Sequence, residues 1–124
     1  MRQALRLFLL GEGATFVVAG LVHRGLLVRG YEHGPASIAE SVIAVVLLGG
    51  LGLTWVWPAG TRPIALAAQA FALLGTLIGT FTIAIGVGPR TVPDVLYHVA
   101  ILVALAWGLV VAARRPADRA TRPA

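Results

Sequence analysis

The sequence contains no cysteine and no lysine, and few of its residues carry a charge. Without cysteine, the chain can form no disulfide, ligate no iron–sulfur cluster and perform no thiol chemistry. Charged residues make up 12% of the 124 residues, whereas a soluble domain usually carries about 25%. Hydrophobic residues make up 58%. This balance indicates an integral membrane protein and not a soluble domain.

All ten basic residues are arginine, which is typical of a GC-rich bacterial genome, and the formal net charge is +5. The arginines lie at the ends of the apolar runs and form no continuous basic face, so nucleic acid is excluded as a partner. Instead they follow the positive-inside rule, with seven on one side of the membrane and three on the other. The seven are Arg2, Arg6, Arg62, Arg114, Arg115, Arg119 and Arg122, and the three are Arg24, Arg29 and Arg90. We therefore predict a multi-pass protein of the bacterial inner membrane with both termini in the cytoplasm.

Four apolar runs are each long enough to cross the hydrocarbon core, which takes about 20 helical residues. They cover residues 5–28, 37–57, 64–87 and 92–113. The first run lacks the cleavage site of a signal peptide, so we expect it to be retained. The predicted fold is all-α, a single antiparallel four-helix transmembrane bundle over residues 1–115. A short polar cytoplasmic tail follows over residues 116–124.

The stretch between the third and fourth runs contains a helix end and a helix start. Gly88-Pro89 is predicted to end the third helix, because proline cannot continue it. Thr91 and Asp94 have the spacing of a capping box, which would begin the fourth helix. Residues 34–40 repeat this pattern with serine and glutamate before the second run. The repeat suggests that the bundle consists of two similar helical hairpins.

Two histidines and two carboxylates are predicted to meet near the outer ends of the helices. His23 lies near the end of the first run and His98 near the start of the fourth, about 8–9 Å inside the outer boundary at 1.5 Å per residue. Glu40 and Asp94 are shallower. Such a set is suited to zinc or non-haem iron, and the two histidines alone could hold a b-type haem axially. The alternative for all four is a structural role as helix caps, interfacial anchors or hydrogen-bond partners.

A second polar group lies deeper in the membrane. Glu12 lies within ~6 Å of the bilayer centre by residue count, where an unpaired carboxyl costs about 2.5–3.5 kcal/mol. Gln69, Thr54 and Thr15 are its candidate hydrogen-bond partners, and Thr15 lies between Glu12 and His23 on one helical face. Thr80 shares a stripe with Gln69 on the third run. The residues predicted to be buried and to hold or transfer a proton are Glu12, Thr15, Gln69 and Thr80.

The first run reads Leu5-Arg6-Leu7, then Gly11 and Phe16, and ends in Gly20-Leu21-Val22-His23. This order of arginine, glycine, aromatic residue and Gly-x-x-His exit resembles the opening of the DoxX-like family of small four-helix bacterial membrane proteins. The resemblance covers about twenty of the 124 residues, and the four-run layout also fits. It implies a four-helix bundle and an accessory role in membrane respiration, redox or sulfur metabolism. It implies no catalytic residue.

Three functions remain open on the sequence. The leading hypothesis is a non-enzymatic, redox-linked accessory protein that binds zinc, iron or haem b at the outer site. The second is a proton- or ion-coupled transporter or channel that uses Glu12, and the third is a purely structural membrane subunit. Enzymatic chemistry is disfavoured, since no serine lies beside a histidine with an orienting acid and no phosphate-binding loop is present. The expected partners are the lipid bilayer and either other membrane subunits or further copies of the chain.

Overall fold

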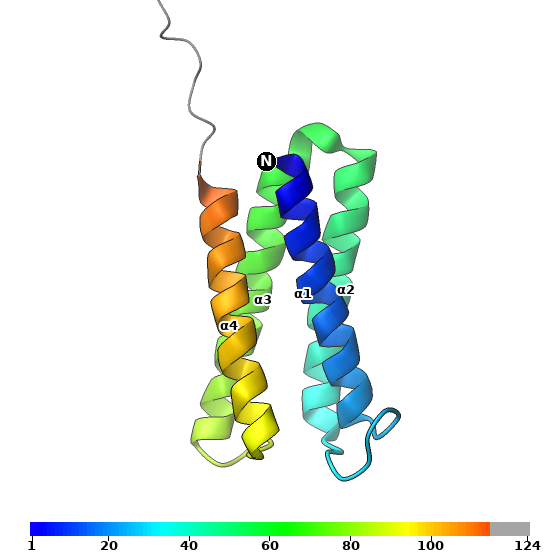
Figure 1. Ribbon diagram of the computed structural model, residues 1–124, viewed down its shortest axis with the longest axis vertical. Helices are drawn as coiled ribbons and strands as arrows, with labels where there is room; N and C mark the ends of the chain where they lie inside the picture. Colours follow the sequence, from blue (N-terminus) through cyan, green and yellow to red (C-terminus); the bar gives the residue numbers. More distant parts are fainter. Residues whose placement is uncertain (115–124) are drawn as a thin grey trace, which may run out of the picture.

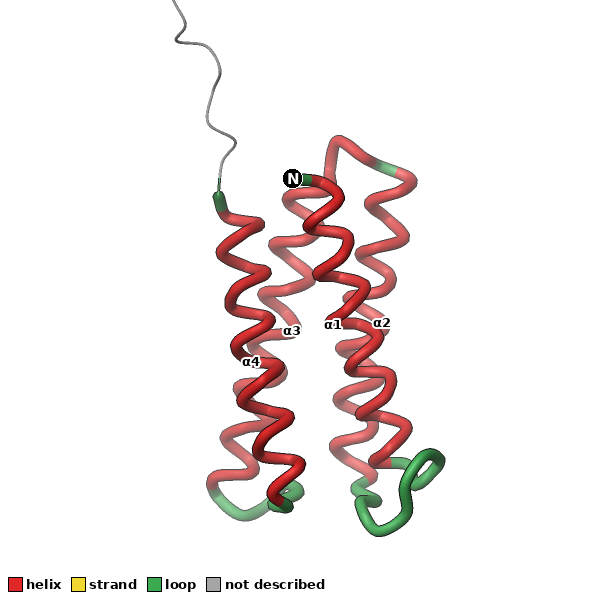
Figure 2. The backbone as a smooth tube through the Cα atoms, in the orientation of Figure 1, coloured by secondary structure: helices red, strands yellow, loops and turns green. Residues whose placement is uncertain are grey.

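The computed structural model describes residues 1–114 as a bundle of four long helices (Figure 1). The helices are α1 (Arg2–His23), α2 (Gly34–Val56), α3 (Thr61–Ala84) and α4 (Val92–Ala113), and the short 3-10 helix η1 (Pro58–Gly60) joins α2 to α3. The described residues form helices and loops without a strand (Figure 2). All four long helices are long and apolar enough to cross a membrane. The predicted all-α four-helix fold is therefore confirmed, while the predicted tail lies outside the described residues.

Successive helices run in opposite directions, so the bundle has two distinct ends (Figure 1). The terminal end holds the N-terminus and η1, and the loop end holds the loops 24–33 and 85–91. The largest helix contact joins α1 to α2, followed by those joining α3 to α4 and α2 to α3. The contact between α1 and α4 is smaller. The side of the bundle between α1 and α4 is therefore the most open.

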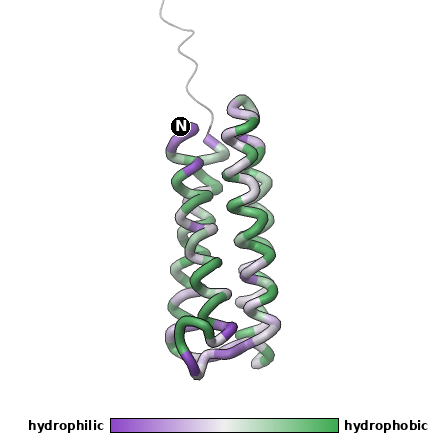
Figure 3. The backbone as a smooth tube through the Cα atoms, turned by 90° about the vertical axis from the view of Figure 1, so that its right-hand side faces the viewer, coloured by the Kyte–Doolittle hydropathy of each residue, from purple (hydrophilic) through white to green (hydrophobic). Residues whose placement is uncertain are grey.

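Large apolar side chains occupy the axis of the bundle and also cover its outside. Leu5, Leu9, Leu47 and Leu105 are fully buried. Figure 3 shows apolar residues along most of the helix length, with many of the hydrophilic residues near the two ends. Polar residues inside this apolar length are few, and those that occur need a partner within the bundle.

Two helix ends differ from the predicted ones. α1 ends at His23 and not at residue 28, because the chain turns through Gly25 and Gly30, whose φ angles are +71° and +94°. α3 ends at Ala84 and not at residue 87, because Gly86 adopts a φ of +84°. Glycine at the position after a helix enters this left-handed region without a Cβ clash. The glycine that ends α3 is therefore Gly86 and not the predicted Gly88.

The two helix starts at the loop end also differ from each other. The predicted capping box of α4 is confirmed, since the Thr91 side chain accepts the Asp94 N–H and the Asp94 carboxylate accepts the Thr91 N–H. The similar pattern before α2 is not a capping box, because His33 is the N-cap and its Nδ1 accepts a backbone N–H of the first turn at 3.2 Å. Ser37 and Glu40 therefore lie inside α2, where Glu40 is directed into the bundle.

Arg62 joins α3 to α4 at the terminal end. Its Nε donates to the carbonyl of Ala112 and its Nη2 to the carbonyl of Ala113, both at 2.9 Å. These carbonyls belong to the last turn of α4 and have no partner within the helix. Arg62 therefore caps α4 from a neighbouring helix.

We expect Arg62→Ala to lower the free energy of unfolding by about 1–2 kcal/mol, because hydrogen bonds from a charged donor contribute about 1.5–3 kcal/mol and this side chain is partly exposed. Titration with a denaturing detergent, followed by tryptophan fluorescence, measures the change. The matched control is Arg2→Ala, which removes an exposed arginine from the same end. A loss no larger than that of the control would contradict the capping role.

Candidate functional site

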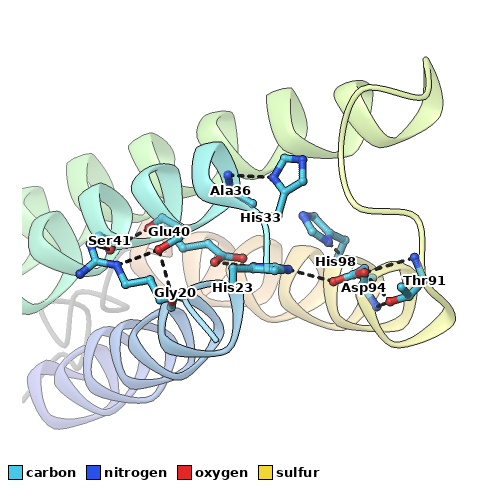
Figure 4. Close-up of polar contacts among 11 residues, drawn as sticks. Gly20, His23, His33, Ala36, Glu40, Ser41, Thr91, Asp94 and His98 are labelled. Carbon is cyan, nitrogen blue, oxygen red and sulfur yellow. Dashed lines mark hydrogen bonds and ion pairs between the residues drawn. The ribbon is translucent and has the colours of Figure 1, made fainter. Parts of the chain in front are cut away.

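At the loop end, the imidazole ring of His23 lies between two carboxylates (Figure 4). His23 Nδ1 is 2.8 Å from Glu40 Oε2, and His23 Nε2 is 3.0 Å from Asp94 Oδ1. The exposed fractions of His23, Glu40 and Asp94 are 4%, 5% and 6%, so all three are buried. We call these three residues the triad. It joins the end of α1 to α2 and to the first turn of α4.

To form both of its hydrogen bonds, the triad needs one proton more than a neutral imidazole and two carboxylates supply. An ionised carboxylate only accepts hydrogen bonds, and a neutral imidazole carries a single N–H. Both ring nitrogens of His23 contact a carboxylate oxygen within hydrogen-bond distance, so the two bonds need two protons. The second proton would lie on the ring, as an imidazolium, or on one of the carboxyl groups. The triad is therefore a candidate proton-binding site.

The two carboxylates of the triad differ in how fully they are bonded. Asp94 Oδ2 accepts the N–H and the hydroxyl of Thr91, so both of its oxygens have partners. Glu40 Oε1 is buried and makes no hydrogen bond within the described part of the chain. The nearby Arg24 donates to Ser37 Oγ at 2.9 Å. Glu40 Oε1 is thus the open acceptor of the triad.

Glu40 lines a cavity of about 260 Å³ between α2, α3 and α4. His98 lines the same cavity, and its Nδ1 lies 2.7 Å from the backbone carbonyl of Asp94. Because a carbonyl only accepts, Nδ1 donates in this bond, and in the neutral form of the ring Nε2 is left as an acceptor. His33 also lines the cavity with the opposite arrangement, since its Nδ1 accepts a backbone N–H. The cavity is therefore lined by two imidazole rings and by Glu40, whose Oε1 is itself buried.

The four predicted metal ligands do not surround a common point. The triad brings His23, Glu40 and Asp94 together, whereas His98 bonds the backbone of Asp94. Within residues 1–114, no group of three or more histidine, aspartate or glutamate side chains is arranged to hold a metal ion. A metal on His23 would have to replace one of its two carboxylates, and a haem would need a free ring nitrogen on His23. The metal and haem sites stay predictions.

In the middle of the bundle, Glu12 is paired with Gln69, one of its three candidate partners. Gln69 Nε2 donates to both carboxylate oxygens of Glu12, at 3.2 and 3.1 Å. Both side chains are buried. Gly108 of α4 packs directly on the pair, because a Cβ at this position would lie 2.1 Å from Gln69 Nε2. Thr54, another candidate partner, instead accepts a hydrogen bond from Arg6 at 3.0 Å.

The two threonines that were predicted to be buried beside these groups bond to their own helices. Thr15 Oγ1 donates to the Gly11 carbonyl at 2.7 Å, and Thr80 Oγ1 donates to the Thr76 carbonyl at 2.8 Å. Thr15 is exposed and Thr80 half-buried, so the predicted burial of Thr15 is wrong. A threonine hydroxyl can satisfy itself on the preceding turn, and the open side between α1 and α4 leaves Thr15 uncovered.

Comparison with protein-family models, with curated proteins and with solved structures finds no match for this chain. The resemblance of the first helix to the DoxX-like family therefore stays a prediction.

Proposed function

We propose that this chain is a small accessory protein of the bacterial inner membrane that takes up and releases a proton at the triad. The observation that carries the proposal is the pair of hydrogen bonds on His23, which need a second proton between three buried groups. Ionisable side chains inside membrane spans commonly belong to proton relays. A redox-linked partner subunit would use such a site as a proton donor or acceptor.

Two hollows give the triad access from opposite sides. The cavity between α2, α3 and α4 reaches Glu40. A groove of about 400 Å³ between α1 and α4 reaches His23 and Asp94. A proton that enters by one hollow and leaves by the other passes through the His23 ring. This arrangement supports exchange and not only storage of the proton.

We propose that the loop end faces the outside of the cell and the terminal end the cytoplasm. Among the described residues, Arg2, Arg6, Arg62 and Arg114 belong to the terminal end, against three arginines in the loops of the other end. The remaining arginines of the terminal side lie outside the described residues. Their count in the sequence adds to the same positive-inside bias.

Nuclear magnetic resonance of ¹⁵N-histidine-labelled protein in lipid nanodiscs tests the proton. We expect both ring nitrogens of His23 to be protonated at neutral pH, and one of them to lose its proton in the double variant Glu40→Gln/Asp94→Asn. The ring of His33 is the internal control, because it lies outside the triad and its Nδ1 accepts a backbone N–H. Infrared spectra of Glu40→Gln and Asp94→Asn detect the alternative location, a protonated carboxyl. A His23 ring with one proton and no protonated carboxyl at either position would contradict the proposal.

A divalent metal ion is a second candidate, favoured by the bonding of His98. Metal-bound histidines usually donate their other ring N–H to a carbonyl or carboxylate, as His98 Nδ1 does to the Asp94 carbonyl. Glu40 Oε1 would be the second ligand, and water would complete the shell.

Calorimetric titration with Zn²⁺ tests this second candidate. We expect about one ion per chain in the wild type, with release of a proton because metal ligands must be deprotonated. Binding should be lost in His98→Ala and kept in His33→Asn. Wild-type protein that binds no Zn²⁺ would exclude the metal. An optical spectrum of the same preparation tests haem, since a Soret band that His98→Ala removes would support axial ligation.

A further inference from the structure

The walls of the cavity between α2, α3 and α4 are mainly apolar. Phe16, Ile43, Ile78 and Ile83 contribute large apolar side chains. The hydroxyls of Thr76 and Thr82, which also line it, donate to carbonyls of their own helix. At about 260 Å³, the cavity lies just below the range of roughly 300–1,000 Å³ that is typical of ligand sites. It suits a molecule with a single ring.

Small residues line part of this cavity. Gly75 and Gly79 line it from α3, and Ala36 and Ala39 line it from α2. A Cβ at Gly79 would lie 3.5 Å from His98 Nε2, so a larger side chain at this position would occupy the space beside that nitrogen.

His98 supplies the polar group of this cavity. Its Nδ1 bonds the Asp94 carbonyl, so in the neutral ring Nε2 is an acceptor. A ligand that pairs with Nε2 therefore has to bring a hydrogen-bond donor. The apolar walls favour a neutral donor, since an ammonium group would lose its hydration there.

We propose that this cavity binds a neutral single-ring apolar molecule with a hydroxyl group, the class of the phenols, whose O–H donates to His98 Nε2. The inference deepens the proposed function because His98 bonds the backbone of Asp94, a member of the triad. Binding itself does not require that the triad releases its proton. The two proposals can therefore fail separately.

Isothermal titration of the full chain in nanodiscs with 4-propylphenol and with its methyl ether, 4-propylanisole, tests the inference. The two probes share a ring and a chain and differ in the donor. After subtraction of empty nanodiscs, we expect saturable binding of the phenol at one molecule per chain. The ether should bind about tenfold more weakly, the factor that corresponds to one net hydrogen bond. Equal binding of the two probes, or tighter binding of benzylamine than of the phenol, would overturn the inference.

Three variants locate the site. His98→Ala should weaken binding of the phenol about tenfold, because it removes the acceptor. Gly79→Leu should abolish binding by filling the cavity while the His23 proton signals stay unchanged. Tyr97→Phe is the matched control, since its unpartnered hydroxyl lies in a residue that lines the groove between α1 and α4. Binding that survives Gly79→Leu would place the phenol elsewhere and refute the site.

Discussion

Replacement of His23 by alanine is expected to lower the free energy of unfolding by about 3–5 kcal/mol, the loss typical when one partner of a buried ion pair is removed. The substitution leaves Glu40 Oε2 and Asp94 Oδ1 facing each other without the ring between them. It also removes the contact that joins the end of α1 to the first turn of α4. Titration of the purified protein with a denaturing detergent, followed by tryptophan fluorescence, measures the change.

The control for this prediction neutralises the two carboxylates. In the triple variant His23→Ala/Glu40→Gln/Asp94→Asn, no charge is left unpaired, so most of the lost stability should return. The variant His33→Asn removes another histidine from the loop end but keeps an N-cap residue, and it should lose less than about 1 kcal/mol. If the triple variant is no more stable than His23→Ala, the loss of stability comes from the missing ring volume and not from the unpaired charges.

The second large effect is expected at Gly108, where alanine should lower the free energy of unfolding by about 2–4 kcal/mol, from overpacking and loss of a buried hydrogen bond. A Cβ there would lie 2.1 Å from Gln69 Nε2 and 2.7 Å from Glu12 Oε1. Because Gln69 is fully buried, its amide cannot move away without leaving Glu12. The same detergent titration measures the loss.

Gly49→Ala is the matched control for Gly108. Gly49 lies in α2, and a Cβ there meets no atom within 4 Å. Alanine is the better helix former, so this variant should be neutral or gain up to about 1 kcal/mol. In a Gln69→Ala background, Gly108→Ala should cost less than it does alone, because the two effects share one contact. If Gly108→Ala lowers the free energy of unfolding equally in the wild-type and Gln69→Ala backgrounds, the proposed clash between the new Cβ and Gln69 is refuted.

The fold could be predicted from hydropathy because four apolar runs of membrane length leave few alternatives to a helical bundle. The helix ends could not be placed as well, since they depend on which glycine adopts a positive φ. The sequence offers several, and the turns use Gly25, Gly30 and Gly86. The missed N-cap of α2 has a similar cause. Histidine is not a usual cap, while the nearby Ser37 and Glu40 have the spacing of a capping box.

The proximity of His23, Glu40 and Asp94 could be predicted from their depth in the membrane, because residues at one level of an antiparallel bundle lie close together. Periodicity does not fix how far each helix is rotated about its axis. For that reason the sequence could not show that both carboxylates contact one ring, that Thr15 is exposed, or that His98 bonds the Asp94 backbone. Burial of a glutamate in the middle of a span, in contrast, requires a polar partner. Gln69 was a candidate partner on the expected stretch of α3.

The pairing of Glu12 with Gln69 has a consequence for how the chain enters the membrane. The two residues are 57 positions apart, so at a synthesis rate of about 5–20 residues per second Gln69 leaves the ribosome about 3–11 s after Glu12. During that interval the carboxyl of α1 has no amide to bond, at a cost of about 2.5–3.5 kcal/mol in the middle of the bilayer. The first hairpin is therefore an incomplete unit when it is made. Arrival of α3 removes this cost from α1, so assembly of the two hairpins contributes to stable insertion.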